Sequence, residues 1–460
     1  MRPHRRSRCS TLLPIALALT VLIPLAAAAP LPVIGTTSGR VEDPGYCAGE
    51  REQRIPHMKI QLVGGASGFS DSNGDFELPC PGTDPVEIAA RLEGRYIRVH
   101  NLAGPDASFL GVALPGTLYP IEWNDGNSSD AERCAYLFGT RVHDMVKRFG
   151  PDWAAPDVLM LVEVNASFSC GTMWDGSKIT LPAAGYGCAN LARIGDAVYH
   201  TYGHAVTQWI YGGNPPDVAE GNADILACFV DGDPLIGEGF LQDDCTHGLH
   251  SVENTLQYPG DYDPQDPYQN GLIIAGFWWD AWRALAVQLG QQDARDVIWS
   301  IWLLSRIHYL SQSLPEQVYC AFLEAGIQRN QQDDDPLYDA LCVGARNHGF
   351  DCPLLNVACP MADGAASHPV LSCFPNPAAG RTMIRFRTLS ADGAGEWDLA
   401  IFDVSGRPVR RMEGRSPAGG SSAITWDGKD EQGRPVPGGL YLVTLQSGGA
   451  RASERVVILR

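Results

Sequence analysis

The spacing of apolar residues changes along the chain and divides it into stretches of different character. Between residues 33 and 115, short runs of alternating apolar and polar residues are separated by Gly, Pro, Asp and Asn, as at 57–63, 75–78, 86–90 and 96–99. Alternation with a period of two, interrupted by turn residues, is typical of half-buried β-strands. This stretch predicts a small β-sandwich.

Helical periodicity begins at residue 129. Ser129-Asp130-Ala131-Glu132 has the pattern of a capping box, and apolar residues follow at helical spacing until Gly150-Pro151. A hairpin-like stretch at 158–181, with a turn at Asp175-Gly176, comes next. Further helices are predicted at 189–211, 217–230, 273–289, 294–310 and 315–328. Strands followed by helices are typical of an α+β domain.

The chain becomes rich in Pro and Ala after residue 349 and returns to strand-like alternation from residue 372. Ile384 and Phe386 alternate there with Arg385 and Arg387, which predicts an immunoglobulin-like β-sandwich. The predicted fold is therefore multidomain: a β-sandwich, an α+β domain and a second β-sandwich. A length of 460 residues fits about three domains, since domains usually contain ~100–200 residues.

The first 29 residues have the composition of a secretory signal. A basic start is followed by an apolar run at 12–25 and by four alanines at 26–29. A membrane anchor is the alternative. Removal of the four arginines in this leader takes the net charge from −19 to about −23, a charge that repels nucleic acid and anionic lipid. Twelve cysteines remain, so disulfides are expected in an oxidising compartment. The sequence therefore predicts a secreted or cell-surface protein.

Two histidines provide the clearest chemical signal. His200 and His204 are four residues apart in a predicted helix, so both imidazoles lie on one face and can bind the same cation. Glu220 in the next predicted helix can supply a third ligand and leave the fourth zinc position open. Asp224 lies one turn further and can hydrogen-bond the outward nitrogen of a ligand histidine. This set of residues predicts a zinc site.

These residues resemble the motif of thermolysin- and fungalysin-like metallopeptidases, which is His-Glu-x-x-His on one helix and Glu-x-x-x-Asp on the next. The resemblance covers about half of the chain and extends to Thr140-Arg141-Val142-His143-Asp144, Met173-Trp174-Asp175-Gly176, Asn270-Gly271-Leu272-Ile273 and Trp279-Asp280. It implies a metallopeptidase-type domain at 117–348, with His200, His204 and Glu220 as zinc ligands and Asp224 behind them.

The sequence departs from this family at the positions that perform the chemistry. Thr201 occupies the place of the glutamate that acts as general base, and a hydroxyl is no base near neutral pH. Gly171-Thr172 stands where the family has an Asn-Ala pair on the substrate-binding edge strand. Tyr268 replaces a histidine that stabilises the oxyanion, although a tyrosine hydroxyl can also donate to one. A pseudoenzyme with a zinc site is favoured; an active secreted endopeptidase with another base and a surface binding or adhesive protein remain open.

The flanking domains resemble two other families. Residues 30–116 resemble the carboxypeptidase regulatory-like domain through Ser38-Gly39-Arg40-Val41 and the segment 70–78. Residues 371–460, after a linker at 349–370, resemble FlgD Ig-like and type IX secretion sorting domains. The motifs are Phe374-Pro375-Asn376-Pro377 and the segments 401–407, 426–430 and 439–441. This likeness implies attachment to the cell surface or to secretion machinery. The metallopeptidase resemblance of the central domain implies an extracellular peptide or protein as its substrate or ligand.

Further metal sites are weaker hypotheses. His247 and His250, near Cys245, suggest either a second metal site or a solvated loop. The carboxylates at 261–266 and at 333–335 could bind calcium, which prefers oxygen ligands, but no twelve-residue calcium loop is present.

Overall fold

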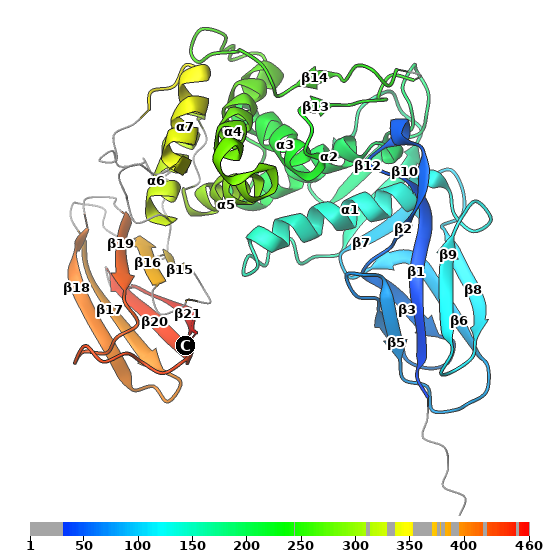
Figure 1. Cartoon of the computed structure of the whole chain (residues 1–460), viewed down its shortest axis with the longest axis horizontal. Helices are drawn as coiled ribbons and strands as arrows, with labels where there is room; N and C mark the ends of the chain where they lie inside the picture. Colours follow the sequence, from blue (N-terminus) through cyan, green and yellow to red (C-terminus); the bar gives the residue numbers. More distant parts are fainter. Residues whose placement is uncertain are drawn as a thin grey trace, which may run out of the picture.

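Figure 1 shows the computed structural model of the chain. It describes residues 31–242, 244–309, 313–328, 336–352, 370–374, 378, 382–387, 395–416, 421–447 and 450–459. The predicted signal at 1–29, residues 353–369 of the predicted linker and the carboxylates at 333–335 lie outside these residues. The described part has seven α-helices and several β-sheets. None of its helices is long and apolar enough to cross a bilayer.

The N-terminal strands lie where the alternation of apolar residues predicts them. In β3, for example, Met58, Ile60 and Leu62 are buried while the residues between them are exposed. β1 pairs with β2 and β5 antiparallel and with β9 parallel, and β3, β4, β6 and β8 belong to a second sheet. The strands are β1 (Val33–Glu42), β2 (Glu50–Arg54), β3 (Met58–Leu62), β4 (Ser67–Phe69), β5 (Asp75–Leu78), β6 (Val86–Gly94), β7 (Ile97–Asn101), β8 (Ser108–Ala113) and β9 (Leu118–Trp123).

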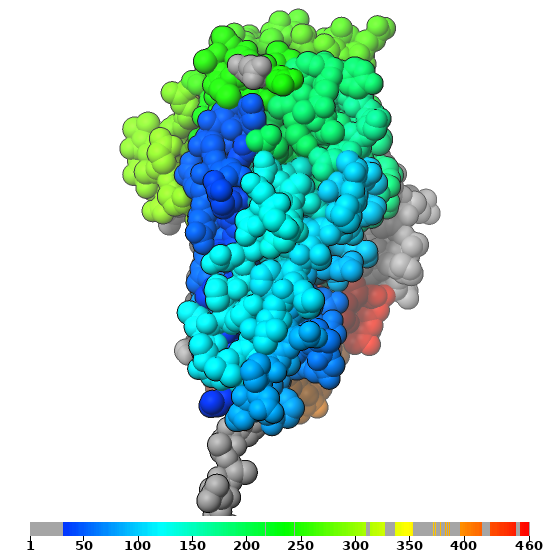
Figure 2. Space-filling view, turned by 90° about the vertical axis from the view of Figure 1, so that its right-hand side faces the viewer, coloured from blue at the N-terminus to red at the C-terminus, as the bar shows by residue number. Residues whose placement is uncertain are grey.

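The second sheet continues into the helical part of the chain. β7 pairs in parallel with β10 (Met160–Ala166), which pairs in parallel with β12 (Lys178–Pro182). One cluster of buried apolar side chains extends from Val33 to Phe350, and Figure 2 shows the N-terminal segments in direct contact with the helical part. The structure therefore differs from a division at 116/117, since β9 lies beyond that point and pairs with β1. Alternation reveals which face of a strand is buried but not which sheet the strand joins.

The strands at 158–181 do not pair as the predicted hairpin would. The first and last strands, β10 and β12, run parallel because a longer connection separates them. The turn at Asp175-Gly176 is where the sequence placed it, between β12 and the short edge strand β11 (Met173–Trp174), which pair antiparallel.

The helices follow, and their ends have clear local causes. Ser129 and Glu132 form both hydrogen bonds of the predicted capping box. Gly212 and Gly232 adopt the left-handed conformation that ends α2 and α3. Helix α7, a short helix between an acidic run and the Pro-rich stretch, was not predicted from the sequence. The helices are α1 (Asp130–Phe149), α2 (Gly195–Tyr211), α3 (Pro216–Asp231), α4 (Pro267–Leu289), α5 (Gln291–Tyr309), α6 (Leu314–Gln328) and α7 (Pro336–Asn347), with short 3₁₀ turns η1 (Tyr46–Ala48) and η2 (Leu191–Arg193).

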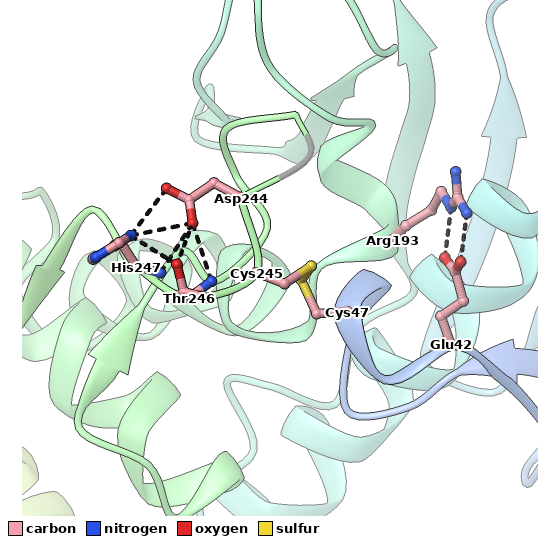
Figure 3. The surroundings of a disulfide bond; sticks show 7 residues. All are labelled: Glu42, Cys47, Arg193, Asp244, Cys245, Thr246 and His247. Carbon is pink, nitrogen blue, oxygen red and sulfur yellow. Dashed lines mark hydrogen bonds and ion pairs between the residues drawn. A yellow bond between two sulfur atoms is a disulfide. The ribbon is translucent and has the colours of Figure 1, made fainter.

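Two contacts fasten the segment after β1 to the helical part (Figure 3). The Cys47–Cys245 disulfide joins η1 to the segment between the two-residue strands β13 (Leu235–Ile236) and β14 (His250–Ser251), 198 residues further along the chain. Close by, both carboxylate oxygens of the buried Glu42 accept hydrogen bonds from the Arg193 guanidinium. The sandwich strands and the helices are thus linked covalently as well as by packing.

The cysteines divide into two groups. Cys170–Cys188 and Cys342–Cys352 are further disulfides, and Cys320 is also disulfide-bonded. The prediction of disulfides is confirmed for these residues. Four others, Cys80, Cys134, Cys228 and Cys373, form no disulfide; Cys134 and Cys228 are fully buried and behave as small apolar core residues.

The C-terminal strands form a separate β domain. A three-stranded and a four-stranded sheet enclose their own apolar core, which contains Ile384, Ile401, Trp426 and Val443. Trp426 Nε1 donates a hydrogen bond to Lys429 O at 2.9 Å. The strands are β15 (Val370–Phe374), β16 (Thr382–Arg387), β17 (Gly395–Asp403), β18 (Pro408–Ser416), β19 (Ser421–Trp426), β20 (Gly439–Ser447) and β21 (Ala450–Ile458).

Candidate metal centre

Close packing of three helices brings the predicted ligands together. On α2, a Cβ added to Gly203 would lie 2.6 Å from the Cα of Ala223 on α3, so only glycine permits this approach. A Cβ on Gly271 of α4 would lie 2.9 Å from the Cβ of Glu220. Because α2, α3 and α4 approach so closely, residues that are far apart in sequence face a common point.

At that point, three potential ligand atoms form a nearly equilateral triangle. His200 Nε2 lies 3.2 Å from His204 Nε2 and 3.4 Å from Glu220 Oε2, and His204 Nε2 lies 3.6 Å from the same oxygen. Zinc bound tetrahedrally at 2.0–2.2 Å requires ligand atoms about 3.3–3.6 Å apart. Glu220 Oε2 is buried and accepts no hydrogen bond from the described residues. The donor set and its spacing fit a tetrahedral zinc ion.

Asp224 binds His200 on the side of the imidazole that faces away from the triangle. Its Oδ1 accepts a hydrogen bond from His200 Nδ1 at 2.7 Å, and its Oδ2 accepts one from His250 Nε2 at 2.9 Å. Since a carboxylate only accepts, the proton of His200 is on Nδ1 and its Nε2 faces the triangle. Asp224 therefore contacts the outward nitrogen of His200, as expected. It also binds His250, for which a second metal site or a solvated loop was expected.

The electrostatics of the metal-free centre follow from this crowding. Burial by itself would lower the pKa of His200, but its hydrogen bond to Asp224 and its ion pair with Glu220 raise it to about 10. Burial and the nearby His200 charge lower the pKa of His204 to about 4. Burial opposes ionisation of Asp224, yet its two histidine partners hold its pKa well below the usual value. One imidazolium, protonated on both nitrogens, thus shares the site with the carboxylates, and a cation in the triangle can replace the proton on His200 Nε2.

Thr201 lies on α2 directly after the first ligand. Its side chain is fully buried, and Oγ1 donates a hydrogen bond to Ala197 O at 2.7 Å. The hydroxyl is therefore bound to the backbone of its own helix. Nothing in this arrangement supplies a proton acceptor.

Tyr268 lies in the first turn of α4, at the side of the centre where the helix packs against Glu220. Its side chain is 62% exposed. The charge of Glu220, followed by partial burial and the charges of Asp224 and Asp266, raises its pKa. Tyr268 therefore stays protonated near neutral pH and can donate a hydrogen bond to a bound group.

Gly171 and Thr172 lie in the loop that leads into the edge strand β11. Gly171 has φ +126°, which favours glycine, and its surroundings are open. β11 is tied to the histidine helix, since Trp174 Nε1 donates to Gln208 Oε1 at 2.7 Å. The structure thus places this loop beside α2 but shows no contact between Gly171 or Thr172 and the metal centre.

Other groups of possible ligands have structural roles. Glu50, Asp125 and Asp130 cluster closely, but the buried Arg133 guanidinium pairs with all three. The exposed His247 interacts with Asp244.

The carboxylates of Asp261, Asp263 and Asp266 accept hydrogen bonds from nearby backbone N–H groups. Calcium binding at 261–266 stays a prediction.

The comparisons with known proteins concern mainly the C-terminal region. Residues 376–450 match the model of the FlgD Ig-like domain. No curated protein matches the chain. Dimeric latent PorU from Porphyromonas gingivalis is 21% identical, with 22% of this chain and 10% of that chain covered and a TM-score of 0.19.

Two further solved structures are similar to parts of this chain. PorZ of P. gingivalis, a surface component of the type IX secretion system, is 20% identical, with coverage of 22% and 13% and a TM-score of 0.17. FlgD from Xanthomonas campestris is 25% identical, with coverage of 20% and 68% and a TM-score of 0.15. The chain thus spans about a tenth of the PorU and PorZ structures, and TM-scores this low support no conclusion about the whole fold. The C-terminal region, in contrast, contains an FlgD Ig-like domain, as the sequence predicted.

Proposed function

We propose that this chain is an exported zinc-binding protein with a thermolysin- or fungalysin-type metallopeptidase domain whose peptidase activity is lost or much weakened. The observation that carries the proposal is the triangle of His200 Nε2, His204 Nε2 and Glu220 Oε2, with sides of 3.2–3.6 Å, next to a threonine at the general-base position. The leader-like start, the disulfides and the FlgD Ig-like domain support export to the cell surface or beyond.

The residues around the triangle define what the site can do. A zinc ion held there would lower the pKa of a coordinated water to about 7. His200 is oriented by Asp224, and Tyr268 can donate a hydrogen bond to a developing oxyanion. The step that lacks a residue is proton transfer, because the Thr201 hydroxyl donates to Ala197 O. General acid–base catalysis usually contributes ~10²–10⁴-fold, so its loss leaves a slow hydrolase or a binding protein.

The zinc assignment is tested by the metal content of purified full-length protein. We expect about one zinc per chain by mass spectrometry, and none after the double change His200→Ala and His204→Ala. A natural protein without zinc, or a double variant that keeps it, contradicts the assignment.

Thr201→Glu tests the catalytic part of the proposal. A glutamate there restores the missing proton acceptor, so hydrolysis of a quenched peptide should increase, towards the low end of ~10²–10⁴-fold because Gly171, Thr172 and Tyr268 still differ from the family. Thr201→Gln is the matched control, because it has the same size but accepts no proton. Equal activity of the two variants, with zinc bound in both, would mean that more than the base is missing. Brisk, chelator-sensitive hydrolysis by the natural protein would favour the alternative, an active endopeptidase with another base.

A further inference from the structure

The part of the chain that builds the metal centre has an unusual charge composition. Residues 194–282, which contain α2, α3 and most of α4, include no lysine or arginine and fourteen aspartates and glutamates. The whole chain has 34 lysines and arginines in 460 residues, so a stretch of this length would contain about six or seven on average. The negative charge of this segment is therefore not neutralised by any lysine or arginine within it.

Three of these carboxylates lie beside the centre. Asp266 caps α4 by accepting hydrogen bonds from the backbone N–H groups of Tyr268 and Gln269, both at 3.1 Å. Asp263 and Asp261 belong to the loop that folds back onto this first turn, since Asp263 N donates to Asn270 Oδ1 at 2.9 Å and Gln269 Nε2 donates to Asp261 O. The same turn of α4 packs against Glu220 through Gly271. We call Asp261, Asp263 and Asp266 the carboxylate rim.

The rim is accessible and carries unbalanced charge. Asp261 and Asp263 are exposed and Asp266 is partly exposed, and none of the three forms an ion pair with another described residue. The histidines and Glu220 are themselves 16–19% exposed, so solvent reaches the centre from outside.

We propose that the surface around the metal centre binds peptides rich in lysine or arginine. This inference rests on the proposed function, because it assigns a ligand class to the same centre. Fixed carboxylates on one side of a site attract cationic chains and repel anionic ones, and this discrimination weakens as salt screens it. The exposed Tyr268 lies in the first turn of α4, which Asp266 caps, and can donate a hydrogen bond to the backbone carbonyl of a bound peptide.

The experiment compares two labelled twelve-residue peptides, one of alternating lysine and alanine and one of alternating glutamate and alanine. Their binding to the full-length protein is followed by fluorescence anisotropy at 20 and 300 mM NaCl. We expect the lysine peptide to bind and the glutamate peptide to show no binding at the same concentrations. The affinity for the lysine peptide should fall at high salt.

Removal of the rim charges tests where the peptide binds. The triple change Asp261→Asn, Asp263→Asn and Asp266→Asn keeps an oxygen for each backbone hydrogen bond, and asparagine is a good helix cap. At roughly twofold per exposed carboxylate, the affinity should fall about eightfold. The matched control removes three exposed carboxylates from the N-terminal strands, through Glu77→Gln, Glu87→Gln and Glu122→Gln, and should leave the affinity nearly unchanged.

The zinc content of the same samples separates the two proposals. A zinc-loaded protein that binds both peptides equally, or that loses the same affinity in the rim and control variants, overturns the inference and leaves the zinc assignment intact. A protein without zinc that still prefers the lysine peptide through the rim refutes the zinc assignment and supports the charge preference.

Discussion

Replacing Asp224 by asparagine tests how the proposed metal centre is held together. Asp224 is 2% exposed, and its two oxygens accept from His200 at 2.7 Å and from His250 at 2.9 Å. Asparagine retains one carbonyl oxygen and directs an amide NH₂ towards the other histidine, so one of the two charge-assisted hydrogen bonds is lost. Since such bonds contribute about 1.5–3 kcal/mol each, we expect the metal-free protein to lose roughly 2–3 kcal/mol in its free energy of unfolding.

The same change should weaken metal binding. Loss of a carboxylate that orients a ligand histidine usually lowers metal affinity 10–100-fold, and zinc competition against a fluorescent chelator at pH 7.5 measures this directly. His250→Gln is the comparison, because it removes the contact with Oδ2 but leaves the one with His200. We expect its zinc affinity to fall less than tenfold. Natural zinc affinity in Asp224→Asn, with the fold intact by circular dichroism, would refute the assignment of Asp224 as the residue that orients His200.

Two further predictions concern stability. Burial raises the pKa of Asp196 to about 6, above its value in an unfolded chain, so the folded state binds more protons and stability falls as pH rises from about 4 to 6. Asp196→Asn should reduce this pH-dependent decrease in the free energy of unfolding by up to ~3 kcal/mol. Urea unfolding in chelator at pH 4 and pH 7 measures the decrease. The same decrease in the natural protein and in the variant would contradict the prediction. Deletion of 370–460 should leave zinc binding and the helical circular dichroism signal intact, because the two apolar cores are separate. Loss of zinc from the truncated protein would contradict this independence.

Local elements were the most predictable part of the fold. The capping box at Ser129, the glycines that end α2 and α3 and the alternation in β3 each act over a few residues, so the sequence indicates them directly. Strand partners could not be predicted. The parallel pairing of β7 with β10 joins the sandwich to the helical part, and nothing in either strand specifies its neighbour.

In the candidate site, too, the features set by nearby residues could be predicted, and a contact between distant residues could not. The spacing of His200 and His204 places both on one helix face, and the motif of Glu220 and Asp224 was sufficient to predict which helix would meet it. The contact of His250 with Asp224 was missed because it crosses 26 residues of chain and β14 is only two residues long. The glycines at 203, 221 and 271 carried a signal, since each removes a side chain where helices touch.

The proposed function combines three metal ligands with a missing general base, so metal binding itself would be the role of the centre, and removal of the metal tests this proposal. A ligand that binds only the folded state stabilises it by RT ln(1 + [L]/Kd), which is about 2.7 kcal/mol at a hundredfold excess over Kd. Chelator should therefore lower the melting temperature of the natural protein by several degrees, and added zinc should restore it. The variant His200→Ala/His204→Ala should melt at one temperature under both conditions. A natural protein that binds zinc yet melts equally with and without it would show that the metal does not stabilise the fold, and a role in binding or chemistry would then be the reason for its ligands.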